Sequence, residues 1–470
     1  MVFSSTLFLF IFLPVTLLGY FLFRGSARNY WLLAVSLVFF AWSQLNYLWI
    51  ILLNVAINYC AAFIIDKYRK YGKVSLFIGI LANLAILFYF KYFDFAVSAF
   101  NSIFKTGISL RNIILPIGIS FFTFQGMSYV IDVYRNEVPV QKNVFKLALY
   151  IVLFPQLIAG PIVRYKDVAA EIDYRENTLE DFTSGIERFI IGLGKKAIIA
   201  NTMASLTDAV WANGAAGNSA PVAWLGSIAY CLQIYYDFSG YSDMAIGLGR
   251  MFGFHFNENF NLPYISKSIT EFWRRWHISL SSWFRDYVYI PLGGNRKHVY
   301  LNLAIVFLLT GIWHGASWHF VVWGIWNGLF ILVERFLHVG KKENRKQHGI
   351  LSALSVLYTL FIVNVGWVLF RAPGTKEALT YLGTMFGFVK GTGGFTIRWY
   401  LDNWALTIMI AGVFFASSVP RFLWNKAMKL KLFSGTAGTV IKYAVLLIVF
   451  YLAMIRIVAG TYNPFIYFQF

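Results

Sequence analysis

Long apolar runs recur along the whole chain, and they constrain its fold more than any other feature of the sequence. Several of them reach the roughly 20 residues that an α-helix needs to cross a bilayer. Unpaired backbone groups are costly in hydrocarbon, which excludes open sheets, and no run alternates as the strands of a membrane barrel do. The sequence therefore predicts an all-α polytopic membrane protein. The runs are 6–23, 47–65, 76–90, 113–131, 145–162, 189–203, 222–234, 301–333, 351–370, 406–419 and 441–459.

The composition agrees with a membrane location. Only 13% of the residues are charged and 59% are hydrophobic, whereas soluble domains carry about 25% charged residues. From the run lengths we expect a bundle of about ten to thirteen membrane segments. Some runs are short or broken, so we expect some of these segments to be re-entrant.

The basic residues gather in particular loops. The formal charge is +19, from 40 Lys and Arg against 21 Asp and Glu. Nucleic-acid binding is one interpretation, but basic cytoplasmic loops explain the excess better. The basic loops alternate with the uncharged loop 43–46, which predicts an extracytoplasmic N-terminus. Because cytoplasmic loops account for the charge, we expect no nucleic-acid partner. The first segment has no basic n-region, so we expect a retained span. The basic loops hold Arg24, Arg28, Lys67, Arg69, Lys70, Lys73, Arg135, Lys142, Lys146 and the stretch 341–346.

Several common catalytic and metal-binding patterns are absent from the sequence. The two cysteines, Cys60 and Cys231, both lie in apolar runs, so neither a disulfide framework nor a metal site is expected. There is no G-x-S-x-G elbow and no nucleotide-binding phosphate loop. An ATP-driven pump is therefore not indicated.

Three stretches interrupt the apolar pattern. FPQLIAGPIVRY (154–165) contains two prolines and a glycine, which predicts either a re-entrant segment that lines a site or a kinked ordinary helix. Residues 164–188 are acidic and indicate a solvated connection or an interfacial helix. Residues 257–302 are too aromatic for a solvated loop and too polar for a span, and they favour an amphipathic segment at the interface or inside a funnel.

Two histidines interrupt the run 303–322, which has no Asp, Glu, Lys or Arg. In an unbroken helix, Thr310, Gly311, Ser317 and Trp318 would share the face of His314. His319 would lie about 140° away, so the two rings should not hold one metal. A buried neutral His314 could act as a general base, although a structural hydrogen bond to a neighbouring helix is an equally good explanation. For His319 we expect packing at an interfacial position.

A second histidine lies among aromatic and basic residues in EFWRRWHISLSSWFRDYVYIP (271–291). Arginines beside tryptophans favour an interfacial anchor. The same arginines could instead bind a phosphate-bearing donor. The residues concerned are Trp273, Arg274, Arg275, Trp276, His277 and Arg285.

Acidic residues at membrane depth are few, and Asp132, Asp237 and Asp243 are the clearest. Asp237 could orient a histidine or line a polar vestibule. A proton-coupled transporter of polymer or lipid would use such acids too, so this class of function stays open.

Several long motifs follow one another from one end of the chain to the other. In this order they resemble the membrane-bound O-acyltransferase (MBOAT) family, and most of all its alginate and peptidoglycan O-acetyltransferase branch. The teichoic acid D-alanyl transfer branch shares the RWHISLS-like and WHG-like pieces, and D-alanyl transfer is the alternative reaction. The motifs are MVFSS at the start, LPIGISFFTFQGMSYVIDVYR (115–135), FPQLIAGPIVR (154–164), QIYYDFSGYSDMAIGLGRMFGF (233–254), FWRRWHISLSSWFRDYVYIPLGGNR (272–296), GIWHGASWHFVVWG (311–324) and PFIYFQF (464–470).

The resemblance implies a single integral-membrane acyltransferase domain that encloses a tunnel. Peripheral helices would take up about 1–110, the core about 111–340, and the C-terminal helices and aromatic tail about 341–470. The donor substrate would be cytosolic acetyl-CoA, with no bound cofactor and no metal. His314 and His277 would be catalytic, and His277 in place of the asparagine of lipid-making branches favours polymer modification. Tunnel-lining residues would be Gly311, Gly315, Ser317 and Asp237, and donor-binding residues Arg274, Arg275, Arg285, Trp273 and Trp276.

The resemblance also implies a location and partners. We expect a bacterial cytoplasmic (inner) membrane protein in contact with lipid, and a polysaccharide acceptor such as alginate, another exopolysaccharide or peptidoglycan. Tyr467 in the terminal motif would carry the acyl group outward, unless this aromatic cluster is only an interfacial anchor. No hydrolase-like domain follows Phe470, so we expect a separate SGNH-hydrolase-like acetyltransferase on the outer face. A non-catalytic scaffold for export machinery is the remaining alternative.

Overall fold

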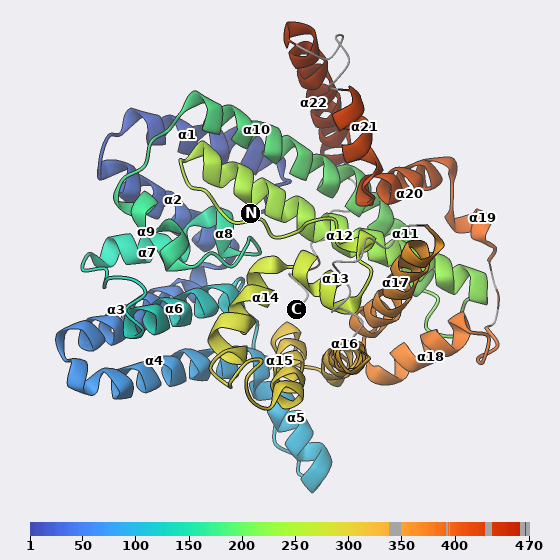
Figure 1. Ribbon diagram of the computed structural model, residues 1–470, viewed down its shortest axis with the longest axis horizontal. Helices are drawn as coiled ribbons and strands as arrows, with labels where there is room; N and C mark the ends of the chain where they lie inside the picture. Colours follow the sequence, from blue (N-terminus) through green and yellow to red (C-terminus); the bar gives the residue numbers. More distant parts are fainter. Residues whose placement is uncertain (338–348, 392, 394, 428–434, 461–465, 467–470) are drawn as a thin grey trace. The chain divides into compact units, whose positions relative to one another are not determined.

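The computed structural model describes residues 1–337, 349–391, 393, 395–427, 435–460 and 466. Within these ranges the regular structure is helical and no strand occurs, as the sequence predicts. The described residues form two compact units, whose helices are labelled in Figure 1. The first unit comprises 1–189 and 242–258, and the second comprises 190–241 and 259–470.

The described helices confirm an integral membrane protein. Five helical stretches are long and apolar enough to cross a membrane. A sixth span is possible if α20 (Asn403–Ala416) and α21 (Val419–Ala427), which meet at 73°, count as one. The sequence predicts about ten to thirteen embedded segments. That number stays a prediction, because the remaining apolar helices are too short to be identified as spans by length. The five stretches are Ala27–Lys67, Arg69–Phe104, Leu179–Trp211, Ile350–Arg371 and Gly435–Val458.

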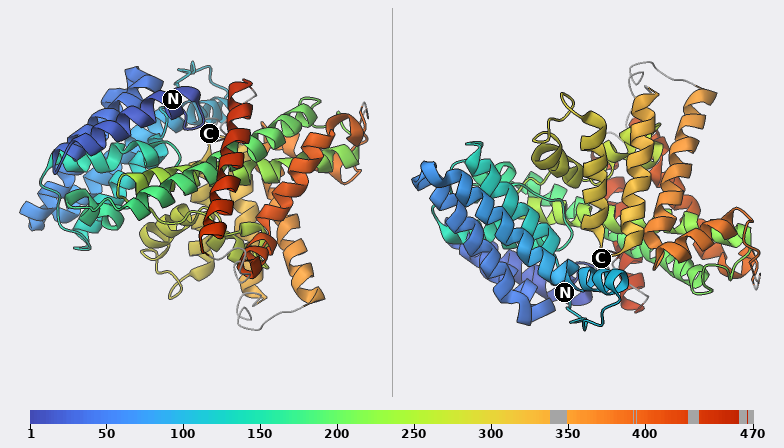
Figure 2. Two further views of the ribbon diagram at one scale, coloured as in Figure 1. Left: turned by 90° about the horizontal axis from the view of Figure 1, so that it is seen from above. Right: turned by 90° about the horizontal axis from the view of Figure 1, so that it is seen from below.

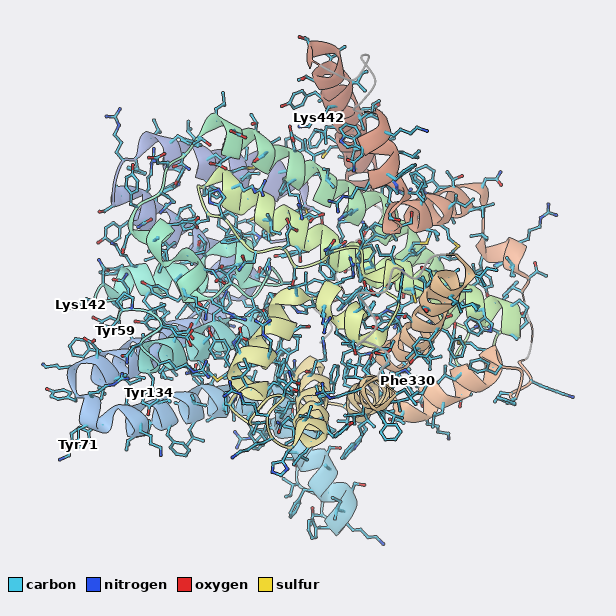
Figure 3. The ribbon with its side chains drawn as sticks, viewed as in Figure 1. Tyr59, Tyr71, Tyr134, Lys142, Phe330 and Lys442 are labelled. Atoms are coloured by element: carbon cyan, nitrogen blue, oxygen red, sulfur yellow. The ribbon has the colours of Figure 1, made fainter. Side chains whose placement is uncertain are left out.

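The first unit is built around packed apolar helices. The helices α3 and α4 run side by side and both contact α6 (Figures 1 and 2). At its edge, the Tyr59 hydroxyl donates to the carbonyl of Lys142 at 2.8 Å, and both residues are labelled in Figure 3. Its helices are α1 (Leu13–Leu22), α2 (Ala27–Gln44), α3 (Leu48–Lys67), α4 (Gly72–Leu87), α5 (Phe93–Phe104), α6 (Ile119–Tyr134), α7 (Val144–Val152), α8 (Phe154–Leu157), α9 (Tyr165–Asp173) and most of α10 (Leu179–Gly194).

Three buried asparagines join α3 to α4. Asn54 Nδ2 donates to Asn83 Oδ1 at 2.6 Å, and Asn83 Nδ2 donates to Asn58 Oδ1 at 3.0 Å. Gly79 allows the close approach, since a Cβ there would lie 2.9 Å from the Cβ of Ala61. Lipid offers no hydrophobic drive for helix association, so small residues and interhelical hydrogen bonds hold such helices together.

The chain leaves helical structure at the predicted break. After α7, Leu153 is non-helical, and α8 ends at Leu157. Residues 158–164 are buried and non-helical, which excludes an ordinary kinked helix. Irregular backbone at membrane depth is tolerated where protein surrounds it. The acidic stretch after this break forms α9 and the start of α10, and its position at the membrane interface stays a prediction.

The second unit has a core rich in tryptophan, tyrosine and phenylalanine. Within it, α15, α16 and α17 lie side by side (Figure 2). Phe330 of α16, labelled in Figure 3, packs against Tyr358 of α17 with ring centroids 6.5 Å apart. Its helices are α11 (Asn201–Trp211), most of α12 (Ala220–Met251), α13 (Ile269–Arg275), α14 (Ile278–Phe284), α15 (Val299–His314), α16 (Trp318–Phe336), α17 (Ile350–Arg371), α18 (Thr375–Met385), α19 (Ile397–Tyr400), α20, α21 and α22 (Gly435–Val458).

The aromatic and charged stretch 257–302 folds as short helical pieces, with a π-helical segment η7 (Arg285–Tyr289) after α14. Phe272, Trp273 and Trp276 from this stretch are buried in the core of the second unit. These three residues therefore lie in the protein interior and do not form an anchor at the membrane interface. The cysteines are both free, and the expected cytoplasmic stretch 341–346 lies outside the described residues.

Candidate active site

The helix that carries His314 ends at this residue. Gly315 is extended (φ −171°, ψ 155°), and α16 starts at Trp318 with Ser317 as its N-cap residue. The expectation that Ser317 and Trp318 share the face of His314 in one helix is therefore wrong. The physical reason is that GAS combines a glycine with a serine, a residue favoured at helix starts.

Two glycines allow α16 to fold back against α15. A Cβ at Gly311 would lie 2.5 Å from the carbonyl oxygen of Phe320 and 3.1 Å from Cα of Gly324. A Cβ at Gly315 would overlap the ring of Phe320. The described contacts of both glycines are therefore packing contacts with α16, and their lining of a tunnel stays a prediction.

The His314 ring sits among aromatic rings. Its centroid lies 4.9 Å from Trp313, 4.9 Å from Trp323 and 5.1 Å from Phe370, each at a steep angle. His314 is only 6% exposed. His319 is also buried, but it contacts Ser317 Oγ through Nδ1 at 2.8 Å and stacks near Phe320. The packing role expected for His319 agrees with these contacts.

His277 occupies a left-handed backbone conformation (φ 43°) between α13 and α14. Such a conformation is uncommon outside glycine and clusters at functional sites. Its Nδ1 lies 3.1 Å from Asn259 Oδ1, which also accepts from the Ser279 hydroxyl at 2.9 Å. The ring is 1% exposed, and burial lowers the pKa of His277 to about 3, which keeps the imidazole neutral.

Trp313 connects the two predicted catalytic histidines. Its ring centroid lies 6.3 Å from His277 and 4.9 Å from His314. The sequence placed these histidines 37 positions apart without indicating the indole that contacts both. A buried neutral imidazole that is held by rigid rings can accept a proton without first losing a water shell.

A cavity of about 300 Å³ lies beside this aromatic cluster and is lined by three arginines. Arg274 and Arg285, both predicted to bind the donor, are joined there by Arg335, which sequence reasoning missed. Thr310 also lines it, one helical turn before His314. The full lining is Thr270, Trp273, Arg274, Leu280, Ser281, Phe284, Arg285, Tyr289, Asn295, Leu303, Val306, Phe307, Thr310, Ile331 and Arg335.

Comparison with known proteins identifies the chain. The model of the membrane-bound O-acyltransferase family, MBOAT, matches residues 36–362. The chain belongs to the MBOAT family. It is therefore an O-acyltransferase of the membrane, and the family assignment made from the motifs is confirmed.

The similar proteins include O-acetyltransferases. The chain is 41% identical to a probable alginate O-acetylase AlgI of Pseudomonas putida, with 100% of each chain covered. It is 38% identical to a peptidoglycan O-acetyltransferase of Helicobacter pylori, over 82% of this chain and 80% of that one. A teichoic acid D-alanyltransferase of Bacillus subtilis is 30% identical over 55% of this chain and 69% of its own.

Two of the predicted donor-binding residues of this MBOAT protein do not line the three-arginine cavity. Arg275 Nε pairs with Glu271 at 2.8 Å, and its Nη1 donates to the carbonyl of Asn261. Trp276 packs between the rings of Phe272 and Trp367 in the aromatic core. Of the two neighbouring arginines, Arg274 therefore lines the cavity and Arg275 does not.

A buried carboxylate positions the helix that carries Arg274. Both carboxylate oxygens of Glu334 accept at the start of α13, from the backbone N–H of Ile269 at 2.5 Å and of Thr270 at 2.9 Å. A negative charge at a helix N-terminus is stabilising. Sequence reasoning missed Glu334 because its partner is 65 residues away in the chain.

Asp237 is 2% exposed and both of its carboxylate oxygens have described contacts, while its lining of a tunnel stays a prediction. It pairs with Lys196 in the π-helical segment η5 (Lys195–Ala200) and accepts from the backbone of Ile466. Asp243 pairs with Arg188 in the first unit, and Asp132 is buried in α6. Tyr467, predicted to carry the acyl group, lies outside the described residues.

Proposed function

We propose that the chain transfers acetyl groups from cytosolic acetyl-CoA toward the hydroxyl groups of an extracytoplasmic polysaccharide. The support is the MBOAT family together with relatives named for alginate and peptidoglycan O-acetylation. The alginate O-acetylase aligns with the whole chain, whereas the D-alanyltransferase aligns with about half of it. This difference favours an acetyl group over a D-alanyl group as the group transferred.

One observation carries the proposal: the helix that ends at the buried His314 also lines a cavity that contains three arginines. Arg274, Arg285 and Arg335 line the cavity, and Thr310 connects it to the helix that ends at His314. Guanidinium groups bind phosphates bidentately, and acetyl-CoA carries phosphates at the end opposite its thioester. The arginines would hold the donor while its thioester reaches the histidine.

His314 would act as the general base. Its imidazole takes the proton of an incoming hydroxyl as the oxygen attacks the thioester carbonyl. The carbon–sulfur bond then breaks, and the histidine returns the proton to the departing CoA sulfur, so the histidine is restored. The aromatic rings around His314 exclude water, which protects the thioester from hydrolysis. No metal or bound cofactor is required for this step.

His277 would assist through its position beside Trp313. Neutral at working pH, it can donate or accept one hydrogen bond to the substrate or orient the indole that contacts His314. Asn259 fixes the ring through Nδ1. The tunnel-lining role of Gly311, Gly315, Ser317 and Asp237 remains part of this proposal.

The acetyl group would leave the membrane on the outer face. In this proposal Tyr467 takes the acetyl group from the donor and passes it to a separate SGNH-hydrolase-like acetyltransferase, which acetylates the polymer. The protein would lie in the bacterial cytoplasmic membrane with its N-terminus outside, because the basic loops alternate with an uncharged one.

Purified protein in sealed vesicles, supplied with acetyl-labelled acetyl-CoA, tests the reaction. We expect CoA release that depends on an added hydroxyl acceptor, and labelled polymer when the outer-face partner is included. Mass spectrometry of cell-wall and secreted polymers, with and without the protein, identifies the acceptor. A proton-coupled transporter would instead move unmodified polymer without any acetyl donor, and that result would contradict the proposal.

A further inference from the structure

A second cavity lies within the second unit and shares no lining residue with the three-arginine cavity. Its volume is about 710 Å³, and its described lining contains no Asp, Glu, Lys or Arg. Small-molecule sites in proteins have volumes of about 300–1,000 Å³, so this cavity has the size of a ligand site. The lining residues come from α12, α17, α20 and the 3-10 helical turn η6 (Pro263–Ile265).

The wall of this cavity suits hydrocarbon better than a polar ligand. The Tyr264 hydroxyl donates to the carbonyl of Cys231 at 2.5 Å, and Asn364 Nδ2 donates to Cys231 Sγ at 3.1 Å. The indole N–H of Trp224 donates to the carbonyl of Met385 at 2.9 Å. These polar side chains of the lining therefore already have partners within the protein. A sugar or a nucleotide would lose its hydrogen bonds to water here without replacing them.

The cavity opens on the apolar surface of the second unit. Ile228 of α12, Leu357 of α17 and Val413 of α20 line it, and these side chains are 42%, 61% and 56% exposed. The helix α17 is one of the five stretches that are long and apolar enough to cross a membrane. The exposed apolar side chains at the opening therefore face lipid rather than water.

A basic amphipathic helix follows the cavity. Ser417 lines the cavity directly after α20, and α21 then turns by 73° from α20. Arg421 of α21 is exposed and lies four residues after Ser417, so their Cα atoms are at most about 14 Å apart. On the helix, Val419, Phe422 and Leu423 share the face opposite Arg421. Residues 403–427 contain no Asp or Glu, so no acid of α20 or α21 neutralises this arginine. Helices of this kind lie at the membrane surface.

We propose that the cavity and Arg421 together bind one anionic phospholipid of the surrounding membrane. An acyl chain of the lipid occupies the apolar cavity, and the phosphate lies at Arg421, since a guanidinium group can bind phosphate bidentately. The net negative charge of the headgroup complements the uncompensated positive charge of α21. The lipid site lies apart from the proposed acetyl transfer, so its test does not depend on the proposed function.

Native mass spectrometry of the full-length protein in detergent measures lipid binding directly. The protein is titrated with phosphatidylglycerol, which is anionic, or with phosphatidylcholine of the same acyl chains, which is zwitterionic. For the tightest-bound lipid we expect a Kd at least about tenfold lower with phosphatidylglycerol, the worth of one charge-assisted hydrogen bond. Equal affinity of the wild type for the two lipids overturns the proposal.

Two arginine variants test the place of the headgroup. Arg421→Gln should weaken phosphatidylglycerol binding about tenfold and remove the preference over phosphatidylcholine. Arg398→Gln is the matched control, because Arg398 is also exposed but belongs to α19, before the opposite end of α20. The 14 residues of α20 place these ends about 21 Å apart. The control should keep the affinity of the wild type, and an equal loss in both variants overturns the role of Arg421.

A change of volume tests the place of the acyl chain. Ala416 is buried and lines the cavity, so Ala416→Phe should fill part of it and weaken binding of both lipids at least about tenfold. Val445→Phe adds a ring at an exposed position of α22 outside the cavity lining and should bind like the wild type. Leu357→Trp narrows the opening from an exposed position, and it repeats the test if Ala416→Phe does not fold. Unchanged binding in the folded cavity variant overturns the cavity as the place of the acyl chain.

Discussion

The ring of His277 lies 6.3 Å from the ring of Trp313, the residue directly before His314. The indole is therefore in contact with both histidines, at 4.9 Å from the second. Because α15 ends at His314, no following helical turn contacts the imidazole of His314. Its aromatic neighbours hold this imidazole in place. In the proposed reaction, this arrangement separates the base, His314, from the assisting residue, His277.

Removal of the assisting histidine should slow transfer less than removal of the base. We expect His277→Ala to lower kcat about 100-fold, at the low end for an acid–base group. Asn259→Ala should lower it about tenfold, because it frees the ring but leaves it present. Initial rates with labelled acetyl-CoA measure both. A larger loss in Asn259→Ala than in His277→Ala would contradict the assignment.

The arginine cavity predicts a difference between two neighbouring residues. Arg274→Leu should raise the KM for acetyl-CoA about 10-fold to 100-fold, the worth of one charge-assisted hydrogen bond. Arg275→Leu is the matched control, since the half-buried Arg275 pairs with Glu271 and does not line the cavity. Equal effects of the two variants on KM would argue against donor binding in this cavity.

The close contact of α15 and α16 predicts a glycine requirement. Gly311→Ala should destabilise the protein by about 1–3 kcal/mol, because its Cβ would overlap the Phe320 carbonyl. Gly366→Ala in α17 is the control, because the nearest atom to its Cβ would be 3.5 Å away. Thermal unfolding in detergent compares them, and similar stability of both variants would refute the packing argument.

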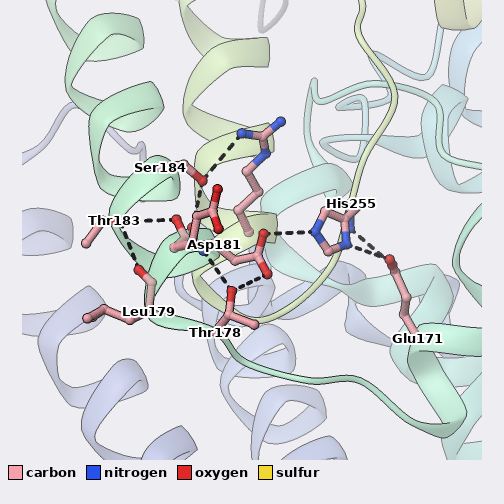
Figure 4. Close-up of polar contacts among 9 residues, drawn as sticks. Glu171, Thr178, Leu179, Asp181, Thr183, Ser184 and His255 are labelled. Carbon is pink, nitrogen blue, oxygen red and sulfur yellow. Dashed lines mark hydrogen bonds and ion pairs between the residues drawn. The ribbon is translucent and has the colours of Figure 1, made fainter. Parts of the chain in front are cut away.

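A histidine of the first unit predicts a pH-dependent stability. His255 contacts Glu171 through Nδ1 at 2.8 Å and Asp181 through Nε2 at 3.2 Å, as Figure 4 shows. Burial opposes its charge, but the hydrogen bonds and charges of both acids prevail and raise the pKa of His255. The stabilisation is present below the ordinary value of about 6.5 and is lost as pH rises through the raised pKa.

His255→Gln should therefore flatten the melting temperature over about pH 6 to about pH 9, whereas the wild type becomes less stable toward the alkaline end. Half of the His255 side chain is exposed, so the change should be modest. An identical pH profile in the variant would show that the two acids do not stabilise the charged ring.

Much of the fold follows from the sequence, because the period and length of apolar runs determine helices locally. The break after Leu157 was predictable from Pro155, Gly160 and Pro161. The end of α15 at His314 was missed, although Gly315 and Ser317 are ordinary stop and start signals. The apolar run is long enough to span a membrane, so one continuous helix was expected in spite of these two local signals.

The candidate site was predictable only in part, because its geometry depends on long-range contacts. His314, His277, Arg274 and Arg285 stood out as polar residues in apolar or aromatic surroundings. Other contributors have partners far along the chain, and no local pattern marks them. These are Asn259, Trp313, Arg335, Glu334 with its contacts to Ile269 and Thr270, and Lys196 with Asp237.

The most direct test of the central claim compares two histidines of the same nine-residue stretch. His314→Gln and His319→Gln are equally conservative changes at equally buried positions. Acetyl transfer from labelled acetyl-CoA is measured for both folded variants in vesicles. We predict a loss of about 100-fold to 10,000-fold in His314→Gln and near wild-type transfer in His319→Gln. Undiminished transfer by His314→Gln would contradict the role of His314 as the base.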